Sequence, residues 1–181
     1  MAHYQQKLFV EETKKLFPQN FNNAKVLECG SLDVNGSTRS LFSNCDYLGI
    51  DNHSGPGVDL VMPLHDINNC DSSKLLYNFD TVISCEMLEH DFYWDFSVKK
   101  MYSVLKPDGL LIITCGGYNR KIHGVQEFAS DPKASHYKNI TVSDFSKAFD
   151  LEFLFKDFRI HYNGGGDLKG DFYFWGVKRY F

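Results

Sequence analysis

The sequence predicts an α/β fold: a doubly wound, mostly parallel sheet with an antiparallel hairpin at its C-terminal end. Three observations predict it: short continuous apolar runs, helical segments between them, and two aromatic runs near the C-terminus. Continuous apolar runs suit parallel strands that helices bury on both faces. The two aromatic runs are joined by NGGGDLKG, which is too short for a crossover helix, so these two strands are expected to be antiparallel.

The elements of the first two thirds follow from apolar runs and from the residues that interrupt them. A helix is expected over 3–17, because its pattern is amphipathic and Pro18 closes it. Five strands and three further helices then alternate. The strands are expected over 25–29, 46–51, 58–61, 79–85 and 109–115, and the helices over 37–42, 71–77 and 91–105.

The last third has a different pattern. The segment 116–140 shows no periodicity, which is typical of a functional or mobile loop. A helix is expected over 142–149, with Thr141 or Ser143 as its cap. The two aromatic strands are then expected over 151–162 and 171–181.

Composition limits the classes of protein that this chain can be. Its 181 residues, 43% of them apolar, suffice for a single domain over 1–181 with a real core. A net charge of −4 and a pI near 5.9 argue against a large basic face for nucleic acid. We expect no membrane span, because no stretch approaches about 20 apolar residues.

The cysteines indicate a reducing compartment. There are five, an odd number, and none forms a C-x-x-C pair. We therefore expect free thiols and a cytoplasmic protein, without a disulfide framework or a zinc site. Cys29, Cys85 and Cys115 each close a predicted strand, where small core residues are common.

A ligand site is expected beyond the carboxyl ends of the strands, where doubly wound sheets bind their ligands. Gly30 follows the first strand and lets the backbone approach a ligand closely. Asp51 closes the second strand, 23 positions after Glu28. A carboxylate there can accept hydrogen bonds from both hydroxyls of a ribose. Asp51 could also be only a turn former.

The loop after the first strand selects among ribose-containing ligands. In KVLECGSLDVNGSTRSLF, Gly30 and Gly36 are six positions apart, and the third glycine of G-x-G-x-x-G is missing. Asp33 would place a negative charge beside a pyrophosphate. A ligand with a cationic centre and no phosphate fits better, and S-adenosylmethionine is such a ligand.

Five segments carry a resemblance to a known family. VLECGSLDVNGSTRSLF, YLGID, GVDLV, FDTVISCEMLEH and LKPDGLLIITCGG occur in this order. Over about 24–117 the sequence resembles the class I S-adenosylmethionine-dependent methyltransferases. The resemblance implies a Rossmann-like sheet of seven strands and S-adenosylmethionine as cofactor. It also implies a cofactor-binding half over 24–117, after an N-terminal helix over 1–18, and an acceptor-side loop, helix and hairpin over 118–181.

The resemblance also implies which residues bind the cofactor. Asp51 falls where the family binds the ribose hydroxyls. The sequence departs from the family's pattern at Leu32, which stands at a glycine position, and at Met62, which stands where an acid is common. Asp66 could take the place of that acid. The implied cofactor-binding residues are Glu28, Gly30, Ser31, Gly36, Asp51, Asn52, His53, Met62, Pro63, Leu64, Cys85 and Glu86.

The acceptor side is less defined. His90 is the expected general base, because it follows the fourth strand and an imidazole titrates near neutral pH. Tyr118 and His123 follow the fifth strand and are expected to bind the substrate. We expect no metal, because Glu86, Glu89 and His90 lack the H-E-x-x-H spacing.

These features favour a methyltransferase that acts on a small-molecule acceptor. There is no N-P-P-Y-like tetrad or Pro-Cys pair after the fourth strand, as in enzymes that methylate bases. Two alternatives stay open. One is a catalytically inactive binding module with the same fold, which Leu32 and Met62 favour. The other is a nicotinamide-dependent oxidoreductase, which the incomplete glycine pattern disfavours. The sequence gives no indication of oligomeric state.

Overall fold

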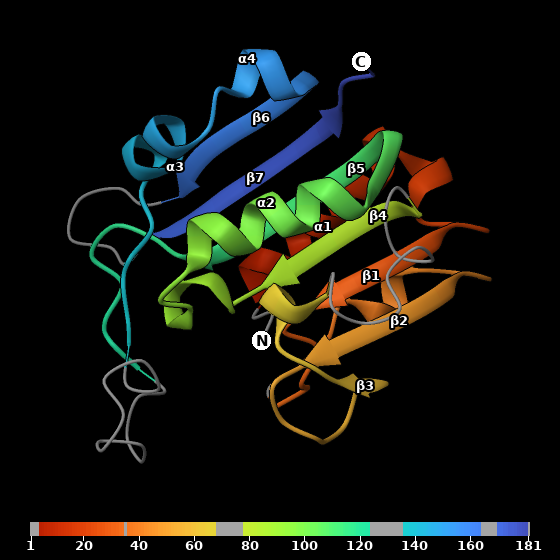
Figure 1. The fold of residues 1–181 in the computed structure, drawn as a ribbon, viewed down its shortest axis with the longest axis horizontal. Coiled ribbons are helices and arrows are strands. Elements are labelled where there is room, and N and C mark those ends of the chain that lie inside the picture. The colour runs from red at the N-terminus through yellow and green to blue at the C-terminus, as the bar shows by residue number, and fades with distance from the viewer. Residues whose placement is uncertain (1–3, 35, 68–77, 124–135, 164–169, 181) are drawn as a thin grey trace.

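The computed structural model describes residues 4–34, 36–67, 78–123, 136–163 and 170–180. They contain one seven-stranded sheet of order β3-β2-β1-β4-β5-β7-β6 (Figure 1). Neighbouring strands in the series β3-β2-β1-β4-β5 are parallel, whereas β7 pairs antiparallel with both β5 and β6. This confirms the predicted fold class, including the C-terminal hairpin. The strands are β1 (Lys25–Cys29), β2 (Asp46–Asp51), β3 (Leu60–Val61), β4 (Phe79–Cys85), β5 (Leu105–Gly116), β6 (Phe155–Asn163) and β7 (Asp171–Lys178).

Helices lie on both faces of the sheet, as doubly wound topology requires. Helix α2 (Trp94–Val104) crosses the front face in Figure 1, and α1 (Tyr4–Leu16) lies behind the strands. Helices α3 (Val142–Ala148) and α4 (Leu151–Leu154) lie near β6. The helix expected over 71–77 lies outside the described residues. Among the helices that the structure describes, none has the length and apolar character to cross a bilayer.

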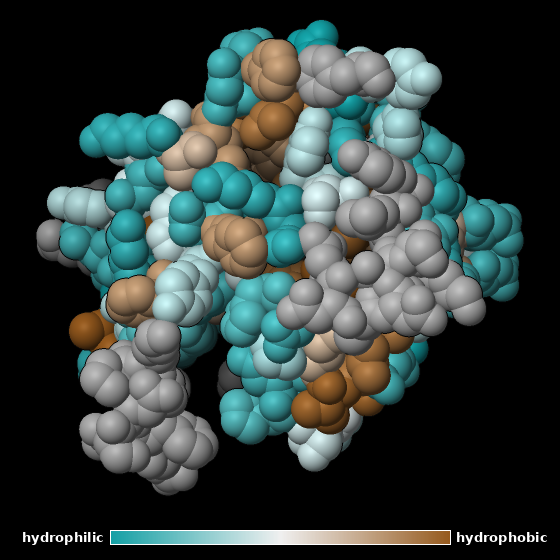
Figure 2. Space-filling view, in the orientation of Figure 1, coloured by the Kyte–Doolittle hydropathy of each residue, from teal (hydrophilic) through white to brown (hydrophobic). Residues whose placement is uncertain are grey.

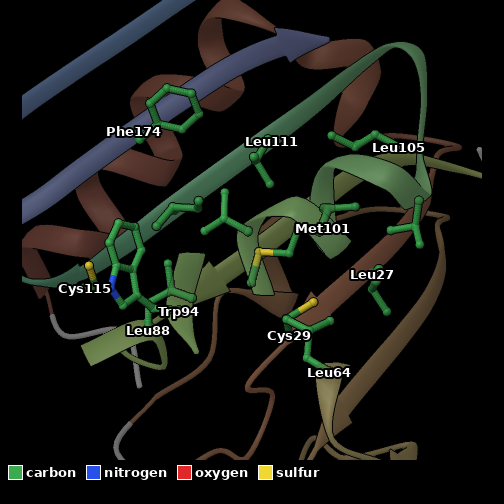
Figure 3. Close-up of a cluster of buried hydrophobic side chains, with 14 of the residues drawn as sticks. Leu27, Cys29, Leu64, Leu88, Trp94, Met101, Leu105, Leu111, Cys115 and Phe174 are labelled. Carbon is green, nitrogen blue, oxygen red and sulfur yellow. The ribbon is translucent and has the colours of Figure 1, made fainter. Parts of the chain in front are cut away.

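The core has two layers, one on each face of the sheet. On the α2 face, Met101 and Trp94 pack with Leu27 and Leu111 of the strands (Figure 3). Phe145 of α3 belongs to the same cluster. On the α1 face, a second set of buried side chains packs together. That set includes Phe9, Val10, Phe21, Val26, Ile83, Ile112, Tyr173 and Trp175.

The cysteines are divided between these two layers. Cys29 and Cys115 belong to the α2 layer, where Figure 3 shows them well apart, and Cys85 belongs to the α1 layer. Burial raises the pKa of all three thiols, that of Cys85 to about 12. They and Cys45 are free, as predicted, and Cys70 lies outside the described residues. The three buried thiols are therefore inert core groups.

The predicted helix over 37–42 is wrong. Only a single 3-10 turn, Arg39–Leu41, forms there. Polar side chains satisfy the backbone instead: Asp33 Oδ1 accepts from the Gly36 N–H at 2.7 Å, and Ser37 Oγ accepts from the Arg39 N–H at 3.0 Å. Such local hydrogen bonds compete with helix formation.

Several boundaries also differ from the prediction. The strand expected over 151–162 begins only at Phe155, because Asp150 caps the short helix α4 with a 3.1 Å bond from the Phe153 N–H. Helix α2 begins at Trp94 rather than at 91, and β5 begins at Leu105 rather than at 109. Thr141 caps α3 through a capping box with Asp144, which selects one of the two expected caps.

The edge strand β3 is shorter than expected, and both of its residues are exposed apolar residues. Leu60 is 41% exposed and Val61 is 54% exposed. Figure 2 shows a hydrophobic area at the lower right, where Figure 1 places β3. A two-residue edge strand offers few unpaired backbone groups for association with another chain.

Candidate functional site

The ends of β1 and β4 meet at Gly30. This residue has φ +78°, and a Cβ there would lie 2.6 Å from Cβ of Met87, which follows β4. Its N–H donates to the carbonyl of Ile50 at 2.9 Å. A glycine is therefore required both by the left-handed backbone and by the packing of Met87.

Asp51 holds the loop that follows β1. Its Oδ2 accepts a hydrogen bond from the Leu32 N–H at 3.2 Å, and its Oδ1 accepts one from the His53 N–H at 3.0 Å. The side chain is only 15% exposed. Each oxygen of a carboxylate has two acceptor sites, and these two hydrogen bonds use one site on each oxygen. The ring nitrogen Nδ1 of His53 lies 3.9 Å from Oδ1. The carboxylate is thus oriented by the backbone and can still accept from a ligand.

The loop after β1 packs against the loop after β2. The Asp33 N–H donates to the Pro56 carbonyl at 2.8 Å, and Leu32 fills the space beside Gly55. Ser31 is buried against Gly49, where a Cβ would come within 2.8 Å of the Ser31 hydroxyl. Leu32 at the usual glycine position therefore has a packing role.

Glu28 is a buried carboxyl beneath this loop. It is 4% exposed, and Tyr47 donates a hydrogen bond to its Oε2 at 3.0 Å. Burial raises the pKa of Glu28 to about 7, although the hydrogen bond from Tyr47 opposes this shift. The group therefore titrates near neutral pH in the folded chain.

The residues expected beside the adenine divide into exposed and buried groups. Asn52 and His53 are exposed, whereas Met62 and Leu64 belong to the core layer under α2. Pro63 between them is half-buried.

The side chain of Glu86 belongs to a network of charged and polar groups. Its backbone has φ +56°, and its carboxylate lies 3.3 Å from Arg120 Nη2 and accepts from the side chain of Gln6 on α1. Arg120 also pairs with Asp171, which accepts from the Tyr173 hydroxyl at 3.0 Å. This network connects α1, the end of β4, the segment after β5 and the start of β7.

A second group of polar side chains lies beside this network, and the sequence interpretation did not bring it together. Glu89, His90 and His123 place ligand atoms within 4.8 Å of one another. The ring of Tyr137 lies 5.2 Å from those of both His90 and His123. Because the histidines come from segments after different strands, no local sequence pattern reveals the group.

The environment of His90 bears on its expected role as a base. Burial, followed by the neighbouring His123, lowers the pKa of His90 to about 4. The imidazole is therefore neutral at physiological pH, but it is a weak base. This disfavours proton abstraction from an acceptor by His90 alone.

Tyr118 lies in a different environment from His123. It lines a cavity of about 240 Å³ together with Ile140, Tyr162 and Phe172. The residue is 59% exposed. The two residues expected to bind substrate are thus placed in separate groups of side chains.

Solved structures of methyltransferases resemble this one over most of the chain. A 1,6-didemethyltoxoflavin-N1-methyltransferase from Burkholderia thailandensis gives a TM-score of 0.65 at 13% identity, over 95% of this chain and 78% of that one. An S-adenosylmethionine-dependent methyltransferase from Archaeoglobus fulgidus gives 0.61 at 14% identity, over 95% and 94%.

The chain has the class I methyltransferase fold. A phosphoethanolamine N-methyltransferase from Haemonchus contortus, solved with S-adenosylmethionine, shares the fold with a TM-score of 0.62 at 14% identity. This chain spans 53% of that protein's length. No family model matches the sequence, and no curated protein matches it significantly. Within the class I methyltransferase fold, Asp51 stands at the carboxyl end of the second strand.

Proposed function

We propose that this chain is an S-adenosylmethionine-dependent methyltransferase that acts on a small-molecule acceptor. The observation that carries the proposal is the carboxylate of Asp51, which two backbone N–H groups orient at the end of β2. The neighbours from Burkholderia thailandensis and Haemonchus contortus were solved with S-adenosylhomocysteine and S-adenosylmethionine, respectively.

The residues around Asp51 suit this cofactor. The free acceptor sites of its carboxylate match the two hydroxyls of a ribose. The exposed Asn52 and His53 follow directly and would lie beside the adenine. The Asp33 side chain accepts from the Gly36 N–H, so the loop presents an acidic group rather than free N–H donors for a pyrophosphate.

In this proposal the cofactor supplies the electrophilic methyl group, and the chain binds, orients and excludes water. The half 24–117 would hold the cofactor, and 118–181 would supply the acceptor side. His90, Tyr118 and His123 are the proposed acceptor-side residues. The free thiols at the described cysteines support a reducing, cytoplasmic location for the enzyme.

Calorimetric titration with S-adenosylmethionine and S-adenosylhomocysteine tests the binding step. We expect binding by the wild type and a loss of about tenfold or more in Asp51→Ala, because a charged hydrogen-bonding group is removed. Asp46→Ala is the matched control, because Asp46 is an exposed acid at the opposite end of the same strand. Absence of binding to either compound contradicts the proposal.

The two alternative functions predict other outcomes. An inactive binding module would bind S-adenosylmethionine but methylate no member of a panel of small hydroxyl, amine and thiol acceptors. A nicotinamide-dependent oxidoreductase would bind NADH but neither S-adenosylmethionine nor S-adenosylhomocysteine.

A further inference from the structure

Three potential ligand side chains converge near the carboxyl ends of β4 and β5. Glu89 and His90 lie in the 3-10 turn Leu88–His90 after β4, and His123 follows β5. Their ligand atoms, one from each side chain, all lie within 4.8 Å of one another. Two imidazoles and a carboxylate form a ligand set that divalent transition metals prefer.

The buried carboxylate of Glu89 lacks a partner for one of its oxygens. The residue is 0% exposed, and its Oε1 accepts from the Gly116 N–H at 2.9 Å. Its Oε2 is buried and has no hydrogen-bond partner among the residues that the structure describes. An unsatisfied buried carboxylate oxygen is costly, and a bound cation would satisfy it.

The ring of His123 contacts the backbone through one of its two nitrogens. Its Nδ1 lies 3.0 Å from the carbonyl of Lys121. Because a carbonyl oxygen only accepts hydrogen bonds, Nδ1 donates in this contact, and Nε2 is the ring nitrogen left for a metal ion. A backbone carbonyl fixes metal-binding histidines in the same way.

Glu86 adds negative charge next to this group. Its Oε2 lies 3.5 Å from Nε2 of His123 and 3.3 Å from Arg120, which neutralises part of that charge. The His123 side chain is 38% exposed, so solvent reaches the group. Three protein ligands beside an open face leave coordination positions for water or another oxygen ligand.

We propose that Glu89, His90 and His123 bind a divalent transition-metal ion through one carboxylate oxygen and two imidazole nitrogens. This differs from the sequence expectation of no metal, which for Glu86, Glu89 and His90 rested on the lack of H-E-x-x-H spacing. Here the third ligand comes from the segment after β5. The site does not depend on methyl transfer, so it can be tested without cofactor or acceptor.

Equilibrium dialysis tests the site directly. Untagged, chelator-treated protein is dialysed against Mn²⁺ or Zn²⁺, and the bound ion is measured by elemental analysis. Mn²⁺ is the primary probe, because the thiolates of free cysteines bind it poorly. We expect one ion per chain in the wild type and binding weakened by about tenfold or more in His123→Ala.

Two further variants sharpen the result. Glu89→Gln keeps an oxygen for the Gly116 N–H but removes the charge, and we expect it to weaken binding similarly. His65→Ala is the matched control, because His65 is an exposed histidine in the 3-10 turn Leu64–Asp66. Circular dichroism checks that each variant is folded. If Glu89→Gln unfolds, the result rests on His123→Ala, because His123 is partly exposed. Wild-type protein without a stoichiometric ion, or His123→Ala that binds as tightly as wild type, overturns the proposal.

Discussion

The side chain of Asp51 accepts a hydrogen bond from the backbone N–H of Leu32, with 3.2 Å between the two atoms. The end of the second strand therefore positions the loop that follows the first strand. We propose two roles for this one carboxylate: it holds the loop, and it binds the ribose of the cofactor.

Asp51→Asn should separate these two roles. An amide oxygen can still accept from the Leu32 N–H, but the charge and one acceptor oxygen are lost. We expect a loss of affinity for S-adenosylhomocysteine of roughly tenfold, with a change in unfolding free energy below about 1 kcal/mol. Calorimetry and urea unfolding measure the two quantities. Equal affinity in Asp51→Asn and wild type would show that the carboxylate does not bind the ribose.

The stability of the folded chain should depend on the positive charge of Arg120 near the end of β4. This side chain faces the carboxylates of Glu86 and Asp171, which are only 6% and 7% exposed. Arg120→Met removes the cation but keeps much of the volume, and we expect a loss of roughly 3 kcal/mol in unfolding free energy.

An exposed ion pair provides the control for Arg120. Lys156 lies 2.6 Å from Asp108, and their side chains are 48% and 63% exposed. Lys156→Met should cost less than about 1 kcal/mol in urea unfolding, because solvent screens the pair. Similar losses of unfolding free energy in the two variants would mean that the buried network stabilises the chain no more than an exposed ion pair does.

The stability of the protein should depend on the protonation of Glu28. Its pKa is raised by burial from 4.5 to about 7, so the folded chain binds the proton more tightly than the unfolded chain. The resulting stabilisation is present below pH 4.5 and is lost as the pH rises to about 7. The shift corresponds to about 3 kcal/mol.

Glu28→Gln removes this titration and keeps an acceptor for the Tyr47 hydroxyl. Urea unfolding at several pH values between 4.5 and 7.5 measures the slope for each protein. We expect a shallower fall in stability with rising pH in the variant. Parallel curves for variant and wild type are the result that this account does not allow.

Gly30→Ala should destabilise the chain through two effects that a second substitution separates. A side chain at φ +78° costs roughly 1 kcal/mol or more, and the new Cβ collides with Met87. Met87→Gly removes both the Cβ and the Cγ that the new side chain would meet, and should relieve only the collision. A double-mutant cycle from urea unfolding should therefore give a favourable coupling of roughly 1 kcal/mol. A coupling near zero would show that Met87 can move aside.

The parallel strands were predictable because strands that are buried on both faces consist of continuous apolar runs. The bounds of β1, β2 and β4 agree with the sequence prediction, since each strand is flanked by residues that interrupt it. The segment 37–42 was not predictable from its pattern. Its hydrogen bonds run through Asp33 and Ser37, and Phe42 stacks on Phe21, whose ring centroid is 4.5 Å away.

The candidate site was predictable only in part, for a similar reason. Asp51 follows a strand, and strand ends are visible in the sequence. The proximity of His123 to Glu89 and His90 depends on the path of the chain after β5, which no local spacing encodes. The ionic network of Glu86 with Arg120 was equally invisible in the sequence, because Arg120 also follows β5, and the expected role of Glu86 at the cofactor stays a prediction.

A crystal structure of the protein with S-adenosylhomocysteine would show whether Asp51 binds the ribose of the cofactor. We predict that the ligand lies at the carboxyl ends of β1, β2 and β4, with its ribose hydroxyls in hydrogen-bond contact with the Asp51 carboxylate. A ligand bound elsewhere, or a ribose that does not contact Asp51, would contradict the account.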